Sequence, residues 1–280
     1  MVPEADRFQL LALDVDGTLL RSDGQVSPHL ATILKRAADD GVRICLCTGR
    51  PLAATLEHVN ALDPGTPPVV FNGALVPSFD GRAVIYRRTL DPAVIQTLVN
   101  YGRQRQFHLE LHTLEECVIE RDGPIATFQR KKFHRELELH PFDEWVTAKQ
   151  IFKAQYVIQG QAAKVAIYAL AERLDGQAVF SWGVSPGFEG HFVNVNAPGV
   201  SKEAALDALL THLGIAWERV LAAGDSPSDL GYVQRAGMGV IMGNAPAEVR
   251  RAAPYVADSV EEDGLAKVIE PYLFDKGSLS

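Results

Sequence analysis

The sequence predicts an α/β protein: a doubly wound, Rossmann-like parallel sheet with an inserted α+β domain. Apolar runs of strand length alternate with helix-length amphipathic segments up to residue 82, and the same alternation resumes after Gly199. Between these parts lie short segments that alternate polar and apolar residues. The 280 residues suffice for about two domains. We therefore expect a discontinuous core formed by residues 1–82 and 190–280, and an inserted domain at 83–189.

The first core segment reads as strands that alternate with helices. Ser27 is placed to cap a helix that has Pro28 at its first position and stops at Gly41. The expected elements of this segment are strands at 8–13, 42–47 and 69–71 and helices at 28–40 and 51–61. Each strand ends in a polar or glycine-containing turn.

The remaining elements follow the same reasoning. In the insertion we expect a helix at 91–104 and strands at 108–112 and 136–140. In the second core segment we expect helices at 201–213, 228–236 and 247–253 and strands at 220–223 and 239–242. Because strands and helices alternate again, this segment would extend the parallel sheet of the first one.

Composition and charge exclude several classes of protein. Asp and Glu exceed Lys and Arg by 35 to 27, so the net charge of −8 opposes nonspecific binding to nucleic acid or an anionic membrane. No run of 18 apolar residues is present, and the start lacks the basic and apolar regions of a signal peptide. Cys45 and Cys47 lie in a strand-like run and, with Cys117, are expected to be reduced thiols. We expect a cytoplasmic protein.

Polar side chains follow the predicted core strands at the points where those strands end. These residues are, in chain order, Asp14, Asp16, Thr48, Asn72, Asp225 and Asp229. The carboxyl ends of parallel strands meet at one edge of a sheet, so the four aspartates should lie close together. Carboxylates so close require a divalent cation, and oxygen ligands favour Mg²⁺ over zinc. Asp14, Asp16, Asp225 and Asp229 are therefore the predicted metal ligands.

Several of these residues, together with Lys202, have side chains of the types that catalyse phosphoryl transfer. Asp14 would attack phosphorus and form an aspartyl-phosphate, while Asp16 would protonate the leaving oxygen and later activate water. Lys202 would neutralise charge on the phosphoryl oxygens, and Thr48 would hold them by a hydrogen bond. We therefore predict Asp14, Asp16, Thr48 and Lys202 as the catalytic residues.

Four motifs in this order resemble those of the haloacid dehalogenase-like hydrolase superfamily. They are D-x-D-G-T at Asp14–Thr18, Thr48, Lys202 after Gly199-Val-Ser, and G-D-S-x-x-D at Gly224–Asp229. Smaller matches resemble the Cof-type phosphatases, which carry a large inserted α+β cap called C2: Leu19-Leu20, Asn72-Gly73-Ala74, residues 242–249 and residues 261–265. The resemblance covers the core segments at both ends of the chain, and the insertion has the position and approximate length of such a cap.

The resemblance implies an Mg²⁺-dependent phosphoric monoester hydrolase that acts on small phosphorylated metabolites, often sugar phosphates. We expect it to act as a monomer or a weak homo-oligomer. Residues placed to contact substrate are Gly49, Arg50, Asn72, Asn194 and Asn244, although Arg50 would equally suit a clamp on the turn after the second strand. Two alternatives stay open: a phosphomutase or phosphotransferase with the same motifs, and a non-hydrolytic protein that binds a phosphorylated metabolite.

Two positions depart from the family pattern. Ser228 replaces the usual Asn of the fourth motif, which bears on support of the metal. Asn194 stands where many relatives have Glu, which bears on contact with the leaving group. Neither change removes a principal motif residue.

The insertion contains His108, Glu110 and His112 at alternate positions of one predicted strand, a pattern that resembles a metal site. We favour a polar face of a half-exposed sheet, with Leu109 and Leu111 packed inward.

Overall fold

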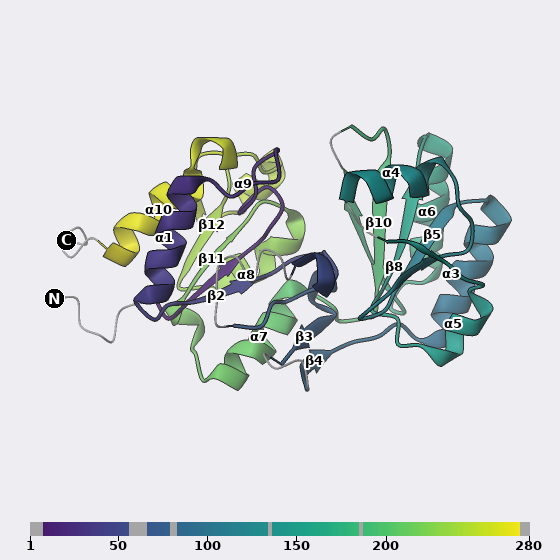
Figure 1. Ribbon diagram of the computed structural model, residues 1–280, viewed down its shortest axis with the longest axis horizontal. Coiled ribbons are helices and arrows are strands. Elements are labelled where there is room, and N and C mark those ends of the chain that lie inside the picture. Colours follow the sequence, from purple (N-terminus) through teal and green to yellow (C-terminus); the bar gives the residue numbers. More distant parts are fainter. Residues whose placement is uncertain (1–7, 56–65, 79–82, 134–135, 185–186, 275–280) are drawn as a thin grey trace. The chain divides into compact units, whose positions relative to one another are not determined.

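The computed structural model describes residues 8–55, 66–78, 83–133, 136–184 and 187–274 (Figure 1). The chain divides into two compact units. The core unit comprises Met1–Arg50, Thr55–Arg87 and Ser201–Ser280, and the cap unit comprises Pro51–Ala54 and Arg88–Val200. The cap unit is thus an insertion in the core unit.

The core unit contains a five-stranded parallel sheet with the order β13-β12-β11-β1-β2. Its strands are β1 (Leu10–Leu13), β2 (Arg43–Leu46), β11 (Val220–Gly224), β12 (Met238–Ile241) and β13 (Tyr255–Val256). From β1 the chain proceeds to β2 on one side, while β11, β12 and β13 follow one another on the other side. The order therefore reverses between β1 and β11, and the predicted doubly wound α/β fold is confirmed.

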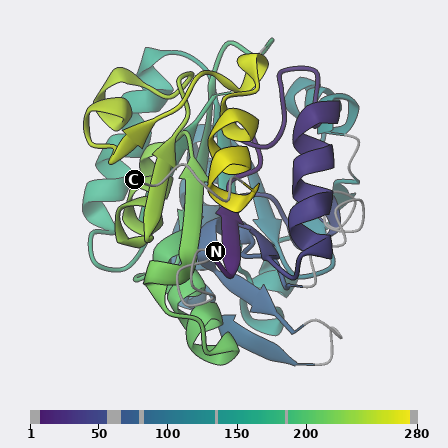
Figure 2. The same cartoon turned by 90° about the vertical axis from the view of Figure 1, so that its left-hand side faces the viewer.

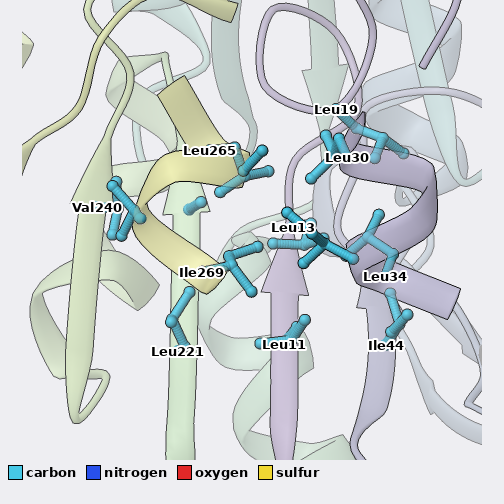
Figure 3. Close-up of a cluster of buried hydrophobic side chains, with 14 of the residues drawn as sticks. Leu11, Leu13, Leu19, Leu30, Leu34, Ile44, Leu221, Val240, Leu265 and Ile269 are labelled. Carbon is cyan, nitrogen blue, oxygen red and sulfur yellow. The ribbon is translucent and has the colours of Figure 1, made fainter. Parts of the chain in front are cut away.

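Helices cover both faces of this sheet. Successive strand residues point to opposite sides, and both sides are apolar here, so both must be shielded from water. Leu11 and Leu13 belong to the apolar cluster formed with α1 (Pro28–Asp39) and α10 (Gly264–Phe274), which lie on the side shown in Figure 2. Figure 3 shows Leu34 of α1 and Ile269 of α10 within that cluster. Leu10 and Ala12 join a cluster on the opposite face. Its helices are α7 (Lys202–Leu213), α8 (Leu230–Arg235) and α9 (Ala247–Arg251).

Helix α1 begins where the sequence predicts it. The Ser27 Oγ accepts a hydrogen bond from the Leu30 backbone N–H at 3.0 Å, and Pro28 occupies the first turn. Leu30, Ile33 and Leu34 recur at helical spacing and are buried against the sheet. Local capping and apolar spacing therefore agree on the position of this helix.

The third parallel strand predicted at 69–71 is reduced to a single paired residue, Val69. Val69 makes only an isolated bridge to Cys47, and the backbone turns at Phe71 and Asn72, whose φ angles are 53° and 60°. The chain then forms an antiparallel hairpin of β3 (Leu75–Pro77) and β4 (Val84–Arg87). Left-handed backbone cannot continue a strand, so the run ends after one pair. Of the helix expected at 51–61, residues 56–61 lie outside the described residues.

The cap unit contains a six-stranded mixed sheet with the order β7-β6-β5-β8-β10-β9. Its strands are β5 (His108–His112), β6 (Cys117–Ile119), β7 (Glu138–Leu139), β8 (Lys153–Ile158), β9 (Val179–Gly183) and β10 (His191–Asn196). The sequence predicts residues 190–200 as part of the core. In the structure β10 pairs with both β8 and β9, so the units change over after Val200 instead.

Leu109, Leu111 and Tyr156 lie on the apolar face of the cap sheet and belong to its main hydrophobic cluster. The helices of that cluster are α3 (Pro92–Arg105), α5 (Asp143–Ala148) and α6 (Gln161–Arg173). Helix α4 (Pro124–Phe133) lies on the opposite side of the sheet from α3 (Figure 1).

The prediction that His108, Glu110 and His112 lie on a half-exposed face is wrong, because this face is buried. Leu109 and Leu111 pack inward as expected, but Glu110 and His112 are also fully buried. Gln129 of α4 donates a hydrogen bond to Glu110, so a polar contact covers this side of the strand. Alternation identified the two faces of β5 and could not show that both are covered.

Among the described residues, no helix has the length and apolar character required to cross a bilayer.

Replacing Leu34 by Ala should destabilise the core unit. Leu34 is fully buried between α1 and the sheet, so the substitution leaves a cavity, and we expect a loss of about 2–5 kcal/mol of unfolding free energy. Urea denaturation measures this loss. Lys35→Ala, at an exposed position of the same helix, is the control and should change stability by less than about 0.5 kcal/mol. Equal effects of the two substitutions would contradict the packing described.

Candidate active site

The candidate site lies beyond the carboxyl ends of β1 and β11, where the strand order reverses. Asp14 follows β1 and Asp225 follows β11. The Asp14 backbone N–H donates to the Ala223 carbonyl at 3.0 Å, which holds the two strand ends together. Crevices at such reversal points are where open α/β sheets bind ligands.

Lys202 is the centre of the site. Its side chain is 3% exposed, and its ammonium group donates to Asp14 Oδ1 at 2.6 Å and to Asp229 Oδ1 at 2.7 Å. It occupies the first position of α7, where the Ser201 Oγ accepts a hydrogen bond from the Ala204 N–H at 3.0 Å. The cap at Ser201 therefore fixes the helix end that carries the lysine.

The second oxygen of Asp229 is held by its own loop. Asp229 Oδ2 accepts from the Ser226 N–H at 2.9 Å, the Ser226 hydroxyl at 2.7 Å and the Asp225 N–H at 3.2 Å. A 3₁₀ turn at Pro227–Asp229 brings the carboxylate back over these donors. Ser228, the departure from the family motif, contacts the Ser226 hydroxyl at 2.8 Å. These contacts hold Asp229 in one orientation beside Lys202.

Asn244 links Asp225 to the loop after β1. Its side-chain amide donates to the Gly17 carbonyl at 2.9 Å and to Asp225 Oδ2 at 3.2 Å, and its oxygen accepts from the Val260 N–H at 2.9 Å. Gly17 has a φ of +82°, and a Cβ there would lie 2.2 Å from Asp225 Oδ2. A glycine is therefore required for this close approach. The sequence predicted a substrate contact for Asn244 and missed its role in positioning Asp225.

The electrostatics of the site favour an added cation. Asp14, Asp225 and Asp229 carry three negative charges when ionised and Lys202 carries one positive charge. Burial, opposed in part by Lys202, raises the pKa of Asp14 well above its usual range. Burial and the neighbouring Asp229 raise the pKa of Asp225 to about 7. Burial opposes the charge of Lys202, but Asp14 and Asp229 outweigh it and raise the lysine pKa.

Asp14, Asp225 and Asp229 also fit a divalent cation geometrically. One carboxylate oxygen from each lies within 4.8 Å of the others. An all-oxygen donor set with excess negative charge suits Mg²⁺. Asp16 is not among the three residues of this group, and its predicted role as a metal ligand stays a prediction.

Asp16 instead pairs with Arg50. The guanidinium donates from Nε to Asp16 Oδ2 at 2.9 Å and from Nη2 to Asp16 Oδ1 at 2.7 Å. The Asp16 side chain is 62% exposed, so this two-point contact orients it without burying it. Thr48 is buried at the end of β2, and its hydroxyl oxygen accepts from the Arg50 N–H at 3.1 Å. The Arg50 guanidinium thus joins the turn after β2 to the loop after β1, and its predicted contact with substrate stays a prediction.

The remaining predicted substrate residues fall into two places. In the core unit, Gly49 lies against Asn72, whose Oδ1 would be 2.4 Å from a Cβ at Gly49. In the cap unit, Asn194 lies on β10 and accepts a hydrogen bond from the Gln155 side chain on β8 at 2.7 Å. Asn194 is therefore part of a polar row on the cap sheet.

Comparison with known proteins identifies the family. The family model for haloacid dehalogenase-like hydrolases matches residues 11–269. The chain therefore belongs to this family, and the predicted enzyme class, a phosphatase of the haloacid dehalogenase superfamily, is confirmed. The resemblance to Cof-type members with an inserted cap holds as well.

Individual relatives span nearly the whole chain. The 5-amino-6-(5-phospho-D-ribitylamino)uracil phosphatases YitU and YcsE of Bacillus subtilis are 29% and 27% identical. YitU aligns over 94% of this chain and 97% of its own length, and YcsE over 95% and 96%. A solved haloacid dehalogenase-like hydrolase from Bacteroides thetaiotaomicron has a TM-score of 0.83 and 27% identity, covering 94% of this chain and 99% of that chain. Core and cap thus both have counterparts.

In the absence of a divalent cation, Asp225 should destabilise the protein as the pH rises. Its pKa of about 7 in the folded state lies above the value of about 3.9 expected when unfolded, so the folded state binds the proton more tightly. Stability should therefore fall as the pH rises from about 4 through 7. Metal-free Asp225→Asn should exceed wild type by about 1–3 kcal/mol at pH 8, allowing for partial exposure, with no such gain at pH 4.

Urea denaturation in a chelator, at pH 4 and pH 8, measures this difference. Excess Mg²⁺ should stabilise wild type at pH 8 and so reduce the difference in unfolding free energy between it and Asp225→Asn. Asp258→Asn, at an exposed ion pair with Lys267, is the control and should show no pH-dependent gain. A gain for Asp225→Asn that is the same at both pH values would contradict the electrostatic account.

Proposed function

We propose that the protein is an Mg²⁺-dependent phosphomonoester hydrolase that acts on small phosphorylated metabolites through an aspartyl-phosphate intermediate. The observation that carries the proposal is the buried Lys202 ammonium, held between Asp14 and Asp229 with Asp225 beside them. This arrangement supplies a fixed carboxylate nucleophile, with the positive charge of Lys202 beside it and carboxylates placed to hold a cation.

Asp14 is the proposed nucleophile. Lys202 holds one of its oxygens, Oδ1, at 2.6 Å, which leaves the other oxygen to attack phosphorus. A bound Mg²⁺, held by Asp14, Asp225 and Asp229, would supply the charge that keeps these carboxylates ionised and attracts the phosphate oxygens. The Thr48 hydroxyl can donate to a phosphoryl oxygen while its own oxygen accepts from Arg50.

Asp16 is the proposed general acid and base. It lies two residues after Asp14 in the same turn, and its exposed carboxyl group can reach both leaving group and water. It would donate a proton to the leaving oxygen when Asp14 attacks, and would accept one from the water that hydrolyses the intermediate. Arg50 orients Asp16 through its two hydrogen bonds.

For the substrate we propose a phosphate ester of a sugar or sugar-like polyol. The support comes from YitU and YcsE, which are named for a substrate with a phosphorylated ribityl chain. The cap, with Gln155 and Asn194 on its polar sheet face, offers amide groups suited to hydroxyl groups of such a chain. The test is phosphate release, with and without Mg²⁺, from ribitol 5-phosphate, hexose phosphates, nucleotides and pyridoxal phosphate. Mg²⁺-dependent release tests the reaction, and faster release from the first two than from the others tests the proposed substrate class.

Asp14→Asn should abolish turnover and leave the fold intact. The amide is nearly isosteric but is not a nucleophile, so we expect kcat to fall at least about 10⁴-fold. Mg²⁺-dependent phosphate release measures it, and circular dichroism checks the fold. Asp39→Asn, at an exposed pair with Lys35 on α1, should retain full activity. Turnover by Asp14→Asn would reject the nucleophile. Transfer of phosphate to a second sugar without net release would favour the phosphomutase alternative.

Asp16→Asn should slow hydrolysis most for substrates whose leaving oxygen needs to be protonated. We expect sugar phosphates to lose about 10²–10⁴-fold in kcat/KM, because an alkoxide is a poor leaving group without protonation. p-Nitrophenyl phosphate, whose leaving oxygen is already weakly basic, should lose about tenfold or less in kcat/KM, which does not include the later hydrolysis of the aspartyl-phosphate. Steady-state rates for both substrates make the comparison. Equal losses would show that Asp16 is not the acid.

A further inference from the structure

The cap unit contains a second cluster of ligand-type side chains, chemically unlike the one in the core. Glu110 and His112 are alternate residues of β5, so they share a face of the strand. Cys117 of β6 pairs directly with His112 in the antiparallel register and reaches the same face. The strand pairing thus places a carboxylate, an imidazole and a thiol together.

The distances within this cluster match those of a tetrahedral metal site. His112 Nε2 lies 3.2 Å from Glu110 Oε2, and Cys117 Sγ lies 3.7 Å from each of these two atoms. Around zinc, bond lengths near 2.0–2.1 Å to N or O and 2.3 Å to S, at tetrahedral angles, separate the ligand atoms by about 3.3–3.6 Å. An ion above this triangle would therefore reach all three atoms with little rearrangement.

The surroundings hold the carboxylate in the required orientation. Glu110 Oε1 is contacted by His108 Nε2 at 2.9 Å and by the side-chain amide of Gln129 on α4. The opposite oxygen, Oε2, is the one that faces His112 and Cys117. Partners of this kind, which orient a ligand without touching the metal, accompany metal sites in general.

Burial and donor chemistry together select the type of ion. Glu110 and His112 are fully buried and Cys117 is partly buried, so the cluster is shielded but reachable. Nitrogen and sulfur ligands exclude Mg²⁺ and Ca²⁺ and favour zinc and related transition metals. Lys153, buried opposite His112 on β8, supplies one positive charge, while the carboxylate and the ionised thiol would supply two negative charges.

We propose that the cap binds one Zn²⁺-type ion through Glu110, His112 and the Cys117 thiolate, with water as the fourth ligand. Binding converts the Cys117 S–H to a thiolate and releases its proton to solvent, while His112 binds in its neutral form. The ion would join β5 to β6 and stabilise the cap. None of its three ligands is assigned a role in the phosphatase reaction, so the proposal goes beyond the proposed function.

Co²⁺ and Zn²⁺ titrations of the full-length, chelator-treated protein test the proposal. A thiolate bonded to Co²⁺ gives a charge-transfer absorption in the near ultraviolet, which the oxygen-only site of the core cannot produce. We expect one equivalent of this absorption in wild type, abolished by stoichiometric Zn²⁺. Thermal unfolding should show a higher Tm with Zn²⁺ than with chelator.

Three variants locate the site. Cys117→Ser should remove the absorption, and Glu110→Gln and His112→Gln should weaken Zn²⁺ binding by at least about tenfold. Cys45→Ala, at a buried cysteine of the core unit, should bind as wild type does. Circular dichroism of each metal-free variant confirms folding, and a variant that does not fold is replaced by His108→Phe, which should weaken binding about 10–100-fold through loss of the contact to Glu110.

Two results would overturn the proposal. One is the absence of the Co²⁺–thiolate absorption from folded wild-type protein at millimolar Co²⁺. The other is an absorption or a Zn²⁺ affinity that persists unchanged in Cys117→Ser and His112→Gln.

Discussion

The core of this enzyme depends on one buried ammonium group. Lys202 is 3% exposed and contacts two carboxylates from different parts of the chain, Asp14 after β1 and Asp229 in the turn after β11. Removing an ammonium group from water is costly unless charged partners surround it, and loss of one partner leaves an uncompensated charge. The three groups must therefore assemble together, which links the loop after β1, the start of α7 and the turn at 227–229.

This requirement explains several contacts that touch no substrate atom. Ser201 caps α7 and fixes the backbone that carries Lys202, while Ser226 holds the far oxygen of Asp229. Asn244 ties Asp225 to the first loop, where Gly17 leaves room for the approach. The site is positioned by the ends of short turns, and the parallel sheet brings those ends to one edge.

Two clusters of ligand-type residues coexist in the chain and differ in chemistry. The core cluster offers only carboxylate oxygens, whereas the cap cluster combines carboxylate, imidazole and thiol. Hard cations prefer the first set and borderline transition metals prefer the second. The difference in donor atoms alone would therefore direct hard cations to the core cluster and transition metals to the cap cluster. Asp16, paired with Arg50 and exposed, stands apart from both clusters.

The sequence by itself determined the α/β class and the family, and it predicted that Asp14, Asp225 and Asp229 lie together. Strand periodicity, helix caps such as Ser27, and motif order are local properties, and parallel strand ends must share an edge of the sheet. The same local reasoning placed a turn at Asn72-Gly73 but did not show that the strand before it pairs through a single residue, because the extent of pairing depends on the neighbouring strand.

Only the tertiary structure decided what lies over each strand face. Alternation along β5 separates Leu109 from Glu110, but burial of Glu110 depends on α4, and its proximity to Cys117 depends on the register with β6. Likewise, the contact between the Arg50 guanidinium and Asp16 joins the ends of two neighbouring strands, which the sequence did not show. Pairing register and helix packing join residues far apart in sequence, and no local pattern encodes them.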